Sequence, residues 1–332
     1  MRPWRTLRRL AVLCGIGGLA VTLPLAADTP RVAETPNEEF DCSQLADWKS
    51  PESATDWYER SLWANHCYIF QARAVRIGID GVRTLALSHD IQDGIEREVA
   101  RFLDGPEVVF ERLGRIGRLS WSSSEDDAPA SPAGAARHLD QFYRLGLGRG
   151  ERIANRSAIR LDIEPLDGLR YGQRLWLDSS TALPLKRELL DDRGRVVETF
   201  QITELQAPRL HDGSVFFDDL RSPPQHPWRP EWLPEGFTAQ PVDTRSERHG
   251  EAVGHRIYSD GLSTLSLFVE SIEEGRERLI PGLHRLGISL AIVRHLTVEE
   301  GPMQVVVMGE LPPRVLAQVA DSLAWKEASG DE

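Results

Sequence analysis

The chain has 332 residues, a hydrophobic share of 41% and a formal net charge of −12. That length favours two domains, and the hydrophobic share is sufficient for two buried cores. The negative charge argues against a nucleic-acid-binding protein, because neutralising phosphates requires an excess of lysine and arginine.

The first 27 residues have the layout of a secretory signal peptide. Four arginines within the first nine residues precede an uncharged, mostly apolar run over 10–25. The run is short for a membrane-spanning helix, which needs about 20 apolar residues, although an uncleaved anchor stays open as the alternative. Cleavage after Ala27 takes the net charge from −12 to −16 and leaves a flexible polar arm over 28–40.

Two cysteines remain after this cleavage, Cys42 and Cys67. An exported protein folds in an oxidising compartment, where such a pair can form a disulfide. Two separate thiols are the alternative, because the sequence does not show the geometry that a disulfide requires.

Residues 41–220 have the pattern of a mostly antiparallel first domain. Apolar residues on one face predict helices, alternating apolar residues predict strands, and short turns between strands favour antiparallel pairing. These patterns predict helices over 53–65 and 139–145, hairpins at Asp80-Gly81 and Asp104-Gly105, a surface loop over 122–136 and a meander of strands over 159–205.

A proline-rich segment follows and separates a second, smaller domain. Four prolines in residues 222–230 favour an extended connection, so we place the linker at 221–230, the second domain at 231–326 and a tail at 327–332. A helix after Pro312-Pro313 on an antiparallel sheet makes this an α+β domain. The sheet is predicted from strands over 253–258, 264–269, 288–296 and 303–308, and the helix from an apolar stripe of Val315, Leu316, Val319, Ala320 and Leu323.

The sequence contains no convincing active site. It has no nucleophile elbow, no HExxH pair, no P-loop and no dinucleotide-binding fingerprint. His249 and His255 have no third ligand nearby, so we expect neither a metal nor a cofactor. Asp162, Glu164 and Asp167 form a carboxylate cluster that a hydrolase could use, but the strand pattern favours an outer, solvated face.

Aromatic residues are spread over the predicted elements of the first domain. A curved sheet lined by them would enclose an apolar cavity for a lipid chain, and a filled core is the alternative. The candidates for the cavity lining are Trp63, Phe70, Phe110, Trp121, Phe142 and Trp176.

Several sequence stretches resemble the RseB/MucB family of regulators of envelope-stress sigma factors. Their order, their spacing and the length of the two domains agree with that family. The stretches are Gly150–Arg156, Ile163–Asp178, Ser180–Leu185 and Leu189–Gly194 in the first domain, and Trp232–Phe237, Tyr258–Glu270 and Val307–Pro313 in the second.

The resemblance implies a fold and a function. The first domain would be a LolA-like half-barrel, an open antiparallel sheet with helices in its concavity. The protein would lie in the periplasm and bind the periplasmic segment of an RseA/MucA-like anti-sigma factor. It would shield that segment from site-1 proteolysis and release it on binding lipopolysaccharide or lipoprotein acyl chains.

We expect the partner contacts on the second domain and the linker. The candidates are Trp228, Trp232, Tyr258, Asp260 and Phe268, although Asp260-Gly261 also suits a turn and Phe268 also suits a core. A periplasmic lipid or lipoprotein carrier and an exported hydrolase remain the competing functions. The sequence leaves the oligomeric state open, a homo-oligomer included.

Overall fold

The computed structural model describes residues 39–105, 108–113, 132–216, 220–221, 226–240, 242–243, 253–272, 278–286, 289–299 and 301–325. These residues belong to one compact unit. The predicted signal peptide, most of the arm over 28–40, the tail and Trp121 lie outside the described residues. Within the described part, no helix is both long enough and apolar enough to cross a membrane.

The first domain is built on one sheet of eleven strands. In chain order they are β2 (Tyr68–Gly78), β3 (Gly81–Gln92), β4 (Ile95–Phe102), β5 (Val109–Leu113), β6 (Tyr143–Leu147), β7 (Glu151–Ile153), β8 (Arg156–Pro165), β9 (Gly172–Asp178), β10 (Pro184–Leu190), β11 (Val196–Leu205) and β12 (Arg209–Leu210). Their spatial order is β5-β4-β3-β2-β11-β10-β9-β8-β6, with β12 beside β2 and β7 beside β8. Neighbours pair antiparallel, so the predicted hairpins and meander are confirmed.

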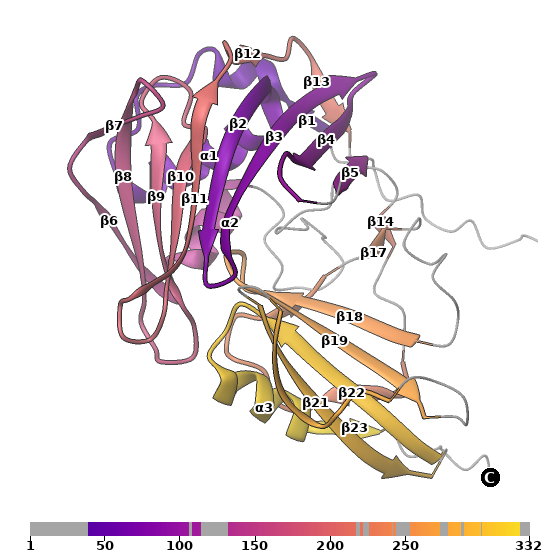
Figure 1. The fold of residues 1–332 in the computed structure, drawn as a ribbon. Coiled ribbons are helices and arrows are strands. Elements are labelled where there is room, and N and C mark those ends of the chain that lie inside the picture. The colour runs from indigo at the N-terminus through magenta and orange to yellow at the C-terminus, as the bar shows by residue number, and fades with distance from the viewer. Residues whose placement is uncertain are drawn as a thin grey trace, which may run out of the picture. The chain divides into compact units, whose positions relative to one another are not determined.

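Helix α1 (Ala54–Cys67) packs against one face of this sheet, as Figure 1 shows. It begins at a capping box, in which Ser53 Oγ accepts from the Asp56 N–H at 3.0 Å and Asp56 Oδ2 accepts from the Ser53 N–H at 2.9 Å. The helix predicted over 53–65 is confirmed and extends to Cys67, directly before β2 begins.

Helix α2 (Pro132–Leu139) corrects two sequence predictions. The helix predicted over 139–145 is wrong, because Tyr143–Leu147 forms strand β6 and pairs with β8. The predicted surface loop over 122–136 is wrong at its end, since residues 132–136 are helical. Tyr143 and Leu145 alternate with Arg144 and Gly146, a period of two that the sheet uses and a short helix does not.

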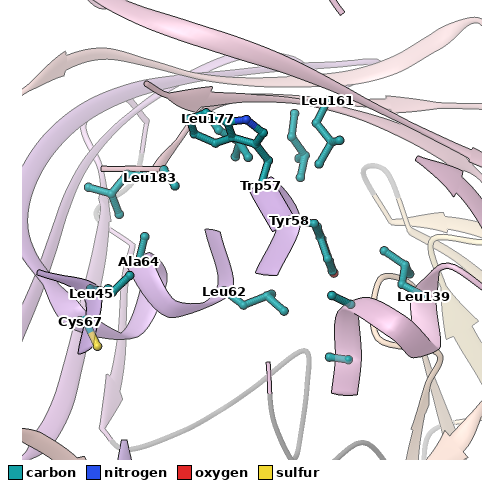
Figure 2. Packing of buried hydrophobic residues seen from close by; sticks show 14 of the residues in the cluster. Leu45, Trp57, Tyr58, Leu62, Ala64, Cys67, Leu139, Leu161, Leu177 and Leu183 are labelled. Carbon is teal, nitrogen blue, oxygen red and sulfur yellow. The ribbon is translucent and has the colours of Figure 1, made fainter. Parts of the chain in front are cut away.

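The first core lies between these helices and the sheet. In Figure 2 the Trp57 indole points from α1 towards Leu161 and Leu177 of the sheet. Tyr58 points towards Leu139 of α2. The core therefore holds α1 and α2 against β8 and β9, two strands of the predicted meander.

The second domain has a six-stranded antiparallel sheet and one helix. Its strands are β16 (Thr238–Ala239), β18 (Val253–Ser259), β19 (Thr264–Ser271), β20 (Gly282–Leu286), β21 (Ser289–Val298) and β22 (Gly301–Gly309), in the order β16-β18-β19-β22-β21-β20. Helix α3 (Pro313–Asp321) packs on β21 and β22 (Figure 1). Val315, Leu316, Val319 and Ala320 are buried in the second core, which confirms this α+β arrangement.

Part of the predicted linker is a strand. Trp228–Pro230 forms β15 and pairs with β23 (Leu323–Trp325), so Leu323 follows α3 instead of extending its stripe. The structure also has the two-stranded pairs β1 (Glu39–Asp41) with β13 (Ser214–Phe216), and β14 (Leu220–Arg221) with β17 (Val242–Asp243). Proline at the end of a short edge strand is tolerated, because its missing N–H faces away from the pairing.

Cys42 and Cys67 form a disulfide, with their Cα atoms 5.4 Å apart. Cys42 begins the short 3-10 helix η1 (Cys42–Leu45), and Cys67 is the last residue of α1. Both are fully buried in the first core. The disulfide therefore fixes the corner where α1 turns into β2.

Replacing both cysteines with alanine should lower the free energy of unfolding by about 3 kcal/mol, because the bond closes a loop across a separation of 25 residues. Urea unfolding of the oxidised protein and of the variant measures this difference. Adding reductant should move the midpoint of the natural protein and leave that of the variant unchanged. Equal midpoints for both proteins without reductant would contradict the role of the bond.

Candidate functional site

A cavity of about 520 Å³ lies between α1 and the inner face of the sheet. Alternation along the strands explains its lining, since every second side chain of β3 and β4 points to this face. From β3 come Leu85, Leu87 and His89, and from β4 come Glu96, Glu98 and Ala100; α1 adds Tyr58, Ser61, Leu62, Asn65 and His66. The volume lies within the range of about 300–1,000 Å³ that is common for small-molecule sites.

Several polar groups of the lining have partners, some in the lining and some behind it. His66 Nδ1 lies 2.6 Å from Glu96 Oε1, and Arg187 Nη2 donates to Glu198 Oε1 at 3.1 Å. His89 Nδ1 lies 2.6 Å from the Tyr68 carbonyl oxygen, an acceptor only, so this nitrogen carries the proton. Arg187 Nη1 is buried and has no hydrogen-bond partner in the described part of the chain. The cavity therefore suits an apolar ligand that carries a hydrogen-bond acceptor.

One of the predicted cavity aromatics, Phe70, lines this cavity. Trp63 lies outside the lining and contacts Trp48 edge-on at 5.9 Å, and Phe142 packs beside His138. Trp176 is buried, and Lys186 Nζ lies 4.1 Å from the centre of its ring. Because Trp176 alternates with Leu175 along β9, its side chain faces away from α1.

The side chains of the other two predicted cavity aromatics, Phe110 and Trp121, lie outside the described residues. Phe110 lies in β5 opposite Ala100, but its side chain is outside the described residues. Trp121 is outside them altogether.

The carboxylate cluster considered for hydrolysis consists of ion pairs. Asp162 pairs with Arg160 at 3.0 Å, Glu164 pairs with Arg144 at 3.8 Å, and Asp167 pairs with Arg170 at 3.1 Å. Among the described residues, no group of three or more His, Cys, Asp or Glu side chains is placed to hold a metal ion.

The turn between β18 and β19, Asp260–Ser263, reaches the first domain; we name it the junction turn. Asp260 is fully buried, and its Oδ1 accepts from the N–H groups of Leu262 at 2.9 Å and Ser263 at 2.7 Å. Its Oδ2 accepts from Tyr143 Oη at 2.8 Å and from Arg170 Nη1 at 2.9 Å. One carboxylate therefore closes its own turn and binds two side chains of the first domain.

Arg170 is itself almost completely buried and is held on several sides. It donates to Asp167 at 3.1 Å and to the Glu235 carbonyl oxygen. Its guanidinium lies 4.8 Å from the centre of the Phe142 ring and 5.5 Å from that of Phe237. A buried charge is tolerated only when it is paired and hydrogen-bonded in this way.

Each core also receives a leucine from the other domain. Leu262 of the junction turn belongs to the first core, and Leu169 of the first domain packs against the second core. Gly236 of the second domain lets the Phe142 ring of the first domain pack against its backbone, because a Cβ at position 236 would lie 2.3 Å from Phe142 Cε2. Its φ of +84° also favours glycine.

Family models match nearly the whole described chain. The MucB/RseB N-terminal domain matches residues 53–224, and the MucB/RseB C-terminal domain matches residues 222–324. The chain belongs to the MucB/RseB family. Similar family members include the sigma factor AlgU regulatory protein MucB of Pseudomonas aeruginosa, 31% identical over 83% of this chain and 92% of that protein. Another is the sigma-E factor regulatory protein RseB of Escherichia coli K12, 25% identical over 78% of this chain and 86% of that protein.

Solved structures of MucB have the same fold. MucB in the Pseudomonas aeruginosa MucA/MucB complex matches with a TM-score of 0.62 and 28% identity, over 83% of this chain and 99% of that one. MucB alone matches with a TM-score of 0.59 and 30% identity, over 82% of this chain and 98% of that one.

The five partner-binding candidates fall into two groups in this MucB/RseB chain. Trp228, Tyr258 and Asp260 are buried, with side chains that hold the second core or the junction. Trp232 and Phe268 are partly exposed, and Phe268 stacks on His255 at 4.1 Å. The sequence predicted the turn at Asp260-Gly261 but gave no signal for Arg170, which lies 90 residues earlier in the chain.

Asp260→Asn should lower the free energy of unfolding by about 3 kcal/mol, because it leaves Arg170 buried without its nearest counter-charge. Urea unfolding measures the loss. The control is Glu204→Gln in the pair with Arg73, whose side chains are 58% and 61% exposed; that change should cost less than about 1 kcal/mol. Similar losses in both variants would contradict the importance of the junction pair.

Burial and the neighbouring charge of Asp260 raise the pKa of Tyr143 well above its usual value. The folded protein then keeps a proton that the unfolded chain loses near pH 10, so stability should fall as the pH rises beyond about 10. Tyr143→Phe should remove this part of the alkaline loss, as measured by urea unfolding between neutral and alkaline pH. An unchanged alkaline slope in Tyr143→Phe would refute the assignment.

Proposed function

We propose that this protein is a periplasmic regulator that binds the periplasmic segment of a transmembrane anti-sigma factor. While bound, the protein shields that segment from site-1 proteolysis, and a lipid or lipoprotein stress signal makes the protein release the segment. The observation that carries the proposal is the match of both domains to MucB, whose solved structures include one in complex with MucA(peri). That match covers 83% of this chain and 100% of that one.

Two features support a periplasmic location. The basic, then apolar N-terminal sequence has the pattern of an export signal. The disulfide between Cys42 and Cys67 requires an oxidising compartment to persist.

The cavity supports a lipid-like signal. Its aliphatic lining suits an acyl chain, and the unpaired Arg187 Nη1 suits an ester carbonyl or a phosphate oxygen on the same molecule. Lipopolysaccharide and lipoproteins both combine these groups. We therefore propose residues 41–220 as the ligand-sensing domain and residues 231–326, with the connecting segment, as the partner-binding part.

The same cavity favours a second candidate, a periplasmic carrier of lipids or lipoproteins. A carrier needs a site that holds its cargo and an acceptor that takes it. Mass spectrometry of the gently purified protein separates the two functions, since a carrier yields a stoichiometric lipid that passes to an acceptor. A regulator needs only reversible binding.

Mixing the mature protein with the periplasmic segment of its host's anti-sigma factor should protect that segment from the site-1 protease. Gel analysis of cleavage at increasing protein concentration measures the protection, and added lipopolysaccharide should relieve it. An unrelated substrate of the same protease is the control and should be cut at its normal rate. Absence of both binding and protection would reject the regulator and favour the carrier.

The protection assay also tests the partner surface. Phe268→Ala should weaken protection about tenfold if this partly exposed ring contacts the partner, since aromatic contacts often dominate interfaces. Leu166→Ala is the matched control, an exposed apolar side chain of the first domain that should leave protection unchanged. Equal protection by both variants would exclude Phe268 from the partner contact.

A further inference from the structure

The junction turn forms part of the wall of the ligand cavity. Gly261 and Leu262 line the cavity, although the turn connects two strands of the second domain. Leu262 is 7% exposed and packs within the first core. Tyr58 of α1 donates its hydroxyl to the Gly261 carbonyl oxygen at 3.3 Å. The second domain therefore supplies one wall of a cavity that the first domain otherwise encloses.

The junction turn is held as one rigid piece. Asp260 Oδ1 accepts from two backbone N–H groups of the turn. Ser259 Oγ accepts from the Gly261 N–H at 3.0 Å and donates to the Ser263 carbonyl oxygen at 2.9 Å. These four hydrogen bonds, two of them made by Ser259 at the end of β18, join the turn to Asp260, so a displacement of Leu262 should move Asp260 with it.

Asp260 is also the anchor that joins the turn to Arg170 and Tyr143. A carboxylate such as that of Asp260 is stable either when it is buried and paired or when it is exposed to water. Any position between these two leaves a charge buried without a partner, which is costly. Tyr143 and Arg170 do not line the cavity. The junction turn is therefore a direct connection between the cavity wall and these two side chains.

We propose that the junction turn couples the cavity to the attachment of the second domain. A ligand with several acyl chains needs the space of Leu262, displaces the turn and separates Asp260 from Arg170 and Tyr143. The second domain is then released from the first, which disturbs the proposed partner-binding part, residues 231–326 with the connecting segment. This inference rests on the proposed lipid-regulated function and assigns the residues that transmit the signal.

Thermodynamic reciprocity gives the proposal a sharp consequence. If the ligand must displace the turn, any change that loosens the turn must tighten ligand binding by the same coupling. A passive wall behaves in the opposite way, since shortening a wall residue removes contacts and weakens binding.

The test uses a synthetic triacylated lipopeptide, titrated by calorimetry into the full mature chain. Leu262→Ala should bind it about tenfold more tightly than the natural protein, because the displaced side chain is gone. Leu85→Ala is the matched control, a leucine of the same wall that is 6% exposed and belongs to the first domain alone; it should bind no more tightly. Both changes remove the same atoms from similarly buried sites, so a general loss of stability is matched.

Tyr143→Phe tests the coupling away from the cavity. It removes the hydroxyl that donates to Asp260 and lies 3.3 Å from Ser263 Oγ. Tyr143 does not line the cavity, so the change should tighten lipopeptide binding about threefold by loosening the turn. Hydrogen exchange provides the second readout. The Leu262 and Ser263 N–H groups should exchange faster in the ligand-bound natural protein, while those of β21 and β22 should not.

The outcomes separate this inference from the proposed function. Binding without faster exchange at the junction turn, or Leu262→Ala binding no more tightly than Leu85→Ala, overturns the coupling and leaves the regulator intact. Failure of every protein to bind the lipopeptide overturns both the coupling and the lipid signal. Protection of the anti-sigma segment would then still support a regulator with another release signal.

Discussion

The buried carboxylate of Asp260 is the interaction on which the arrangement of the rest depends. Removing a carboxylate and a guanidinium from water is costly, and the cost is offset only where every lone pair and N–H finds a partner. Asp260 meets this condition with two backbone N–H groups, a tyrosine and an arginine. The same condition explains the aromatic rings around Arg170, which exclude water from the pair.

The cavity follows from how the first core is filled. The large side chains of α1, such as Trp57, pack towards β8 and β9, and the disulfide holds the other end of the helix. Ala100 of β4 lines the cavity, and on β2 the residues opposite the lining residues Leu87 and Leu85 are Ala72 and Ala74. Small residues at these positions leave space that larger side chains would fill.

Local pattern predicted the elements whose neighbours are close in sequence. The single-face pattern of α1, the hairpins and the stripe of α3 are each decided within a few residues. The helix predicted over 139–145 failed because Tyr143 and Leu145 suit a strand once β8 is beside them. Trp228–Pro230 could not be identified as a strand, since its partner lies at the other end of the second domain.

The candidate site was predicted less well, for the same physical reason. The aromatic residues of the first domain suggested a cavity, with a filled core as the alternative. Which of these rings line the cavity depends on strand register: Phe70 lines it and Trp176 faces away. Asp260 was a reasonable surface candidate in sequence, because a carboxylate at a turn is usually solvated. Its burial is decided by Arg170 and Tyr143, and no local pattern connects them.

The pairing of β15 with β23 brings the two ends of the second domain together. A domain whose N- and C-terminal ends are adjacent can be joined to another protein at a single site, with little constraint on the chain on either side. This is also the geometry that tolerates circular permutation and insertion into a host loop. The second domain is thus topologically portable, and its dependence on the first domain lies in the side chains of the junction.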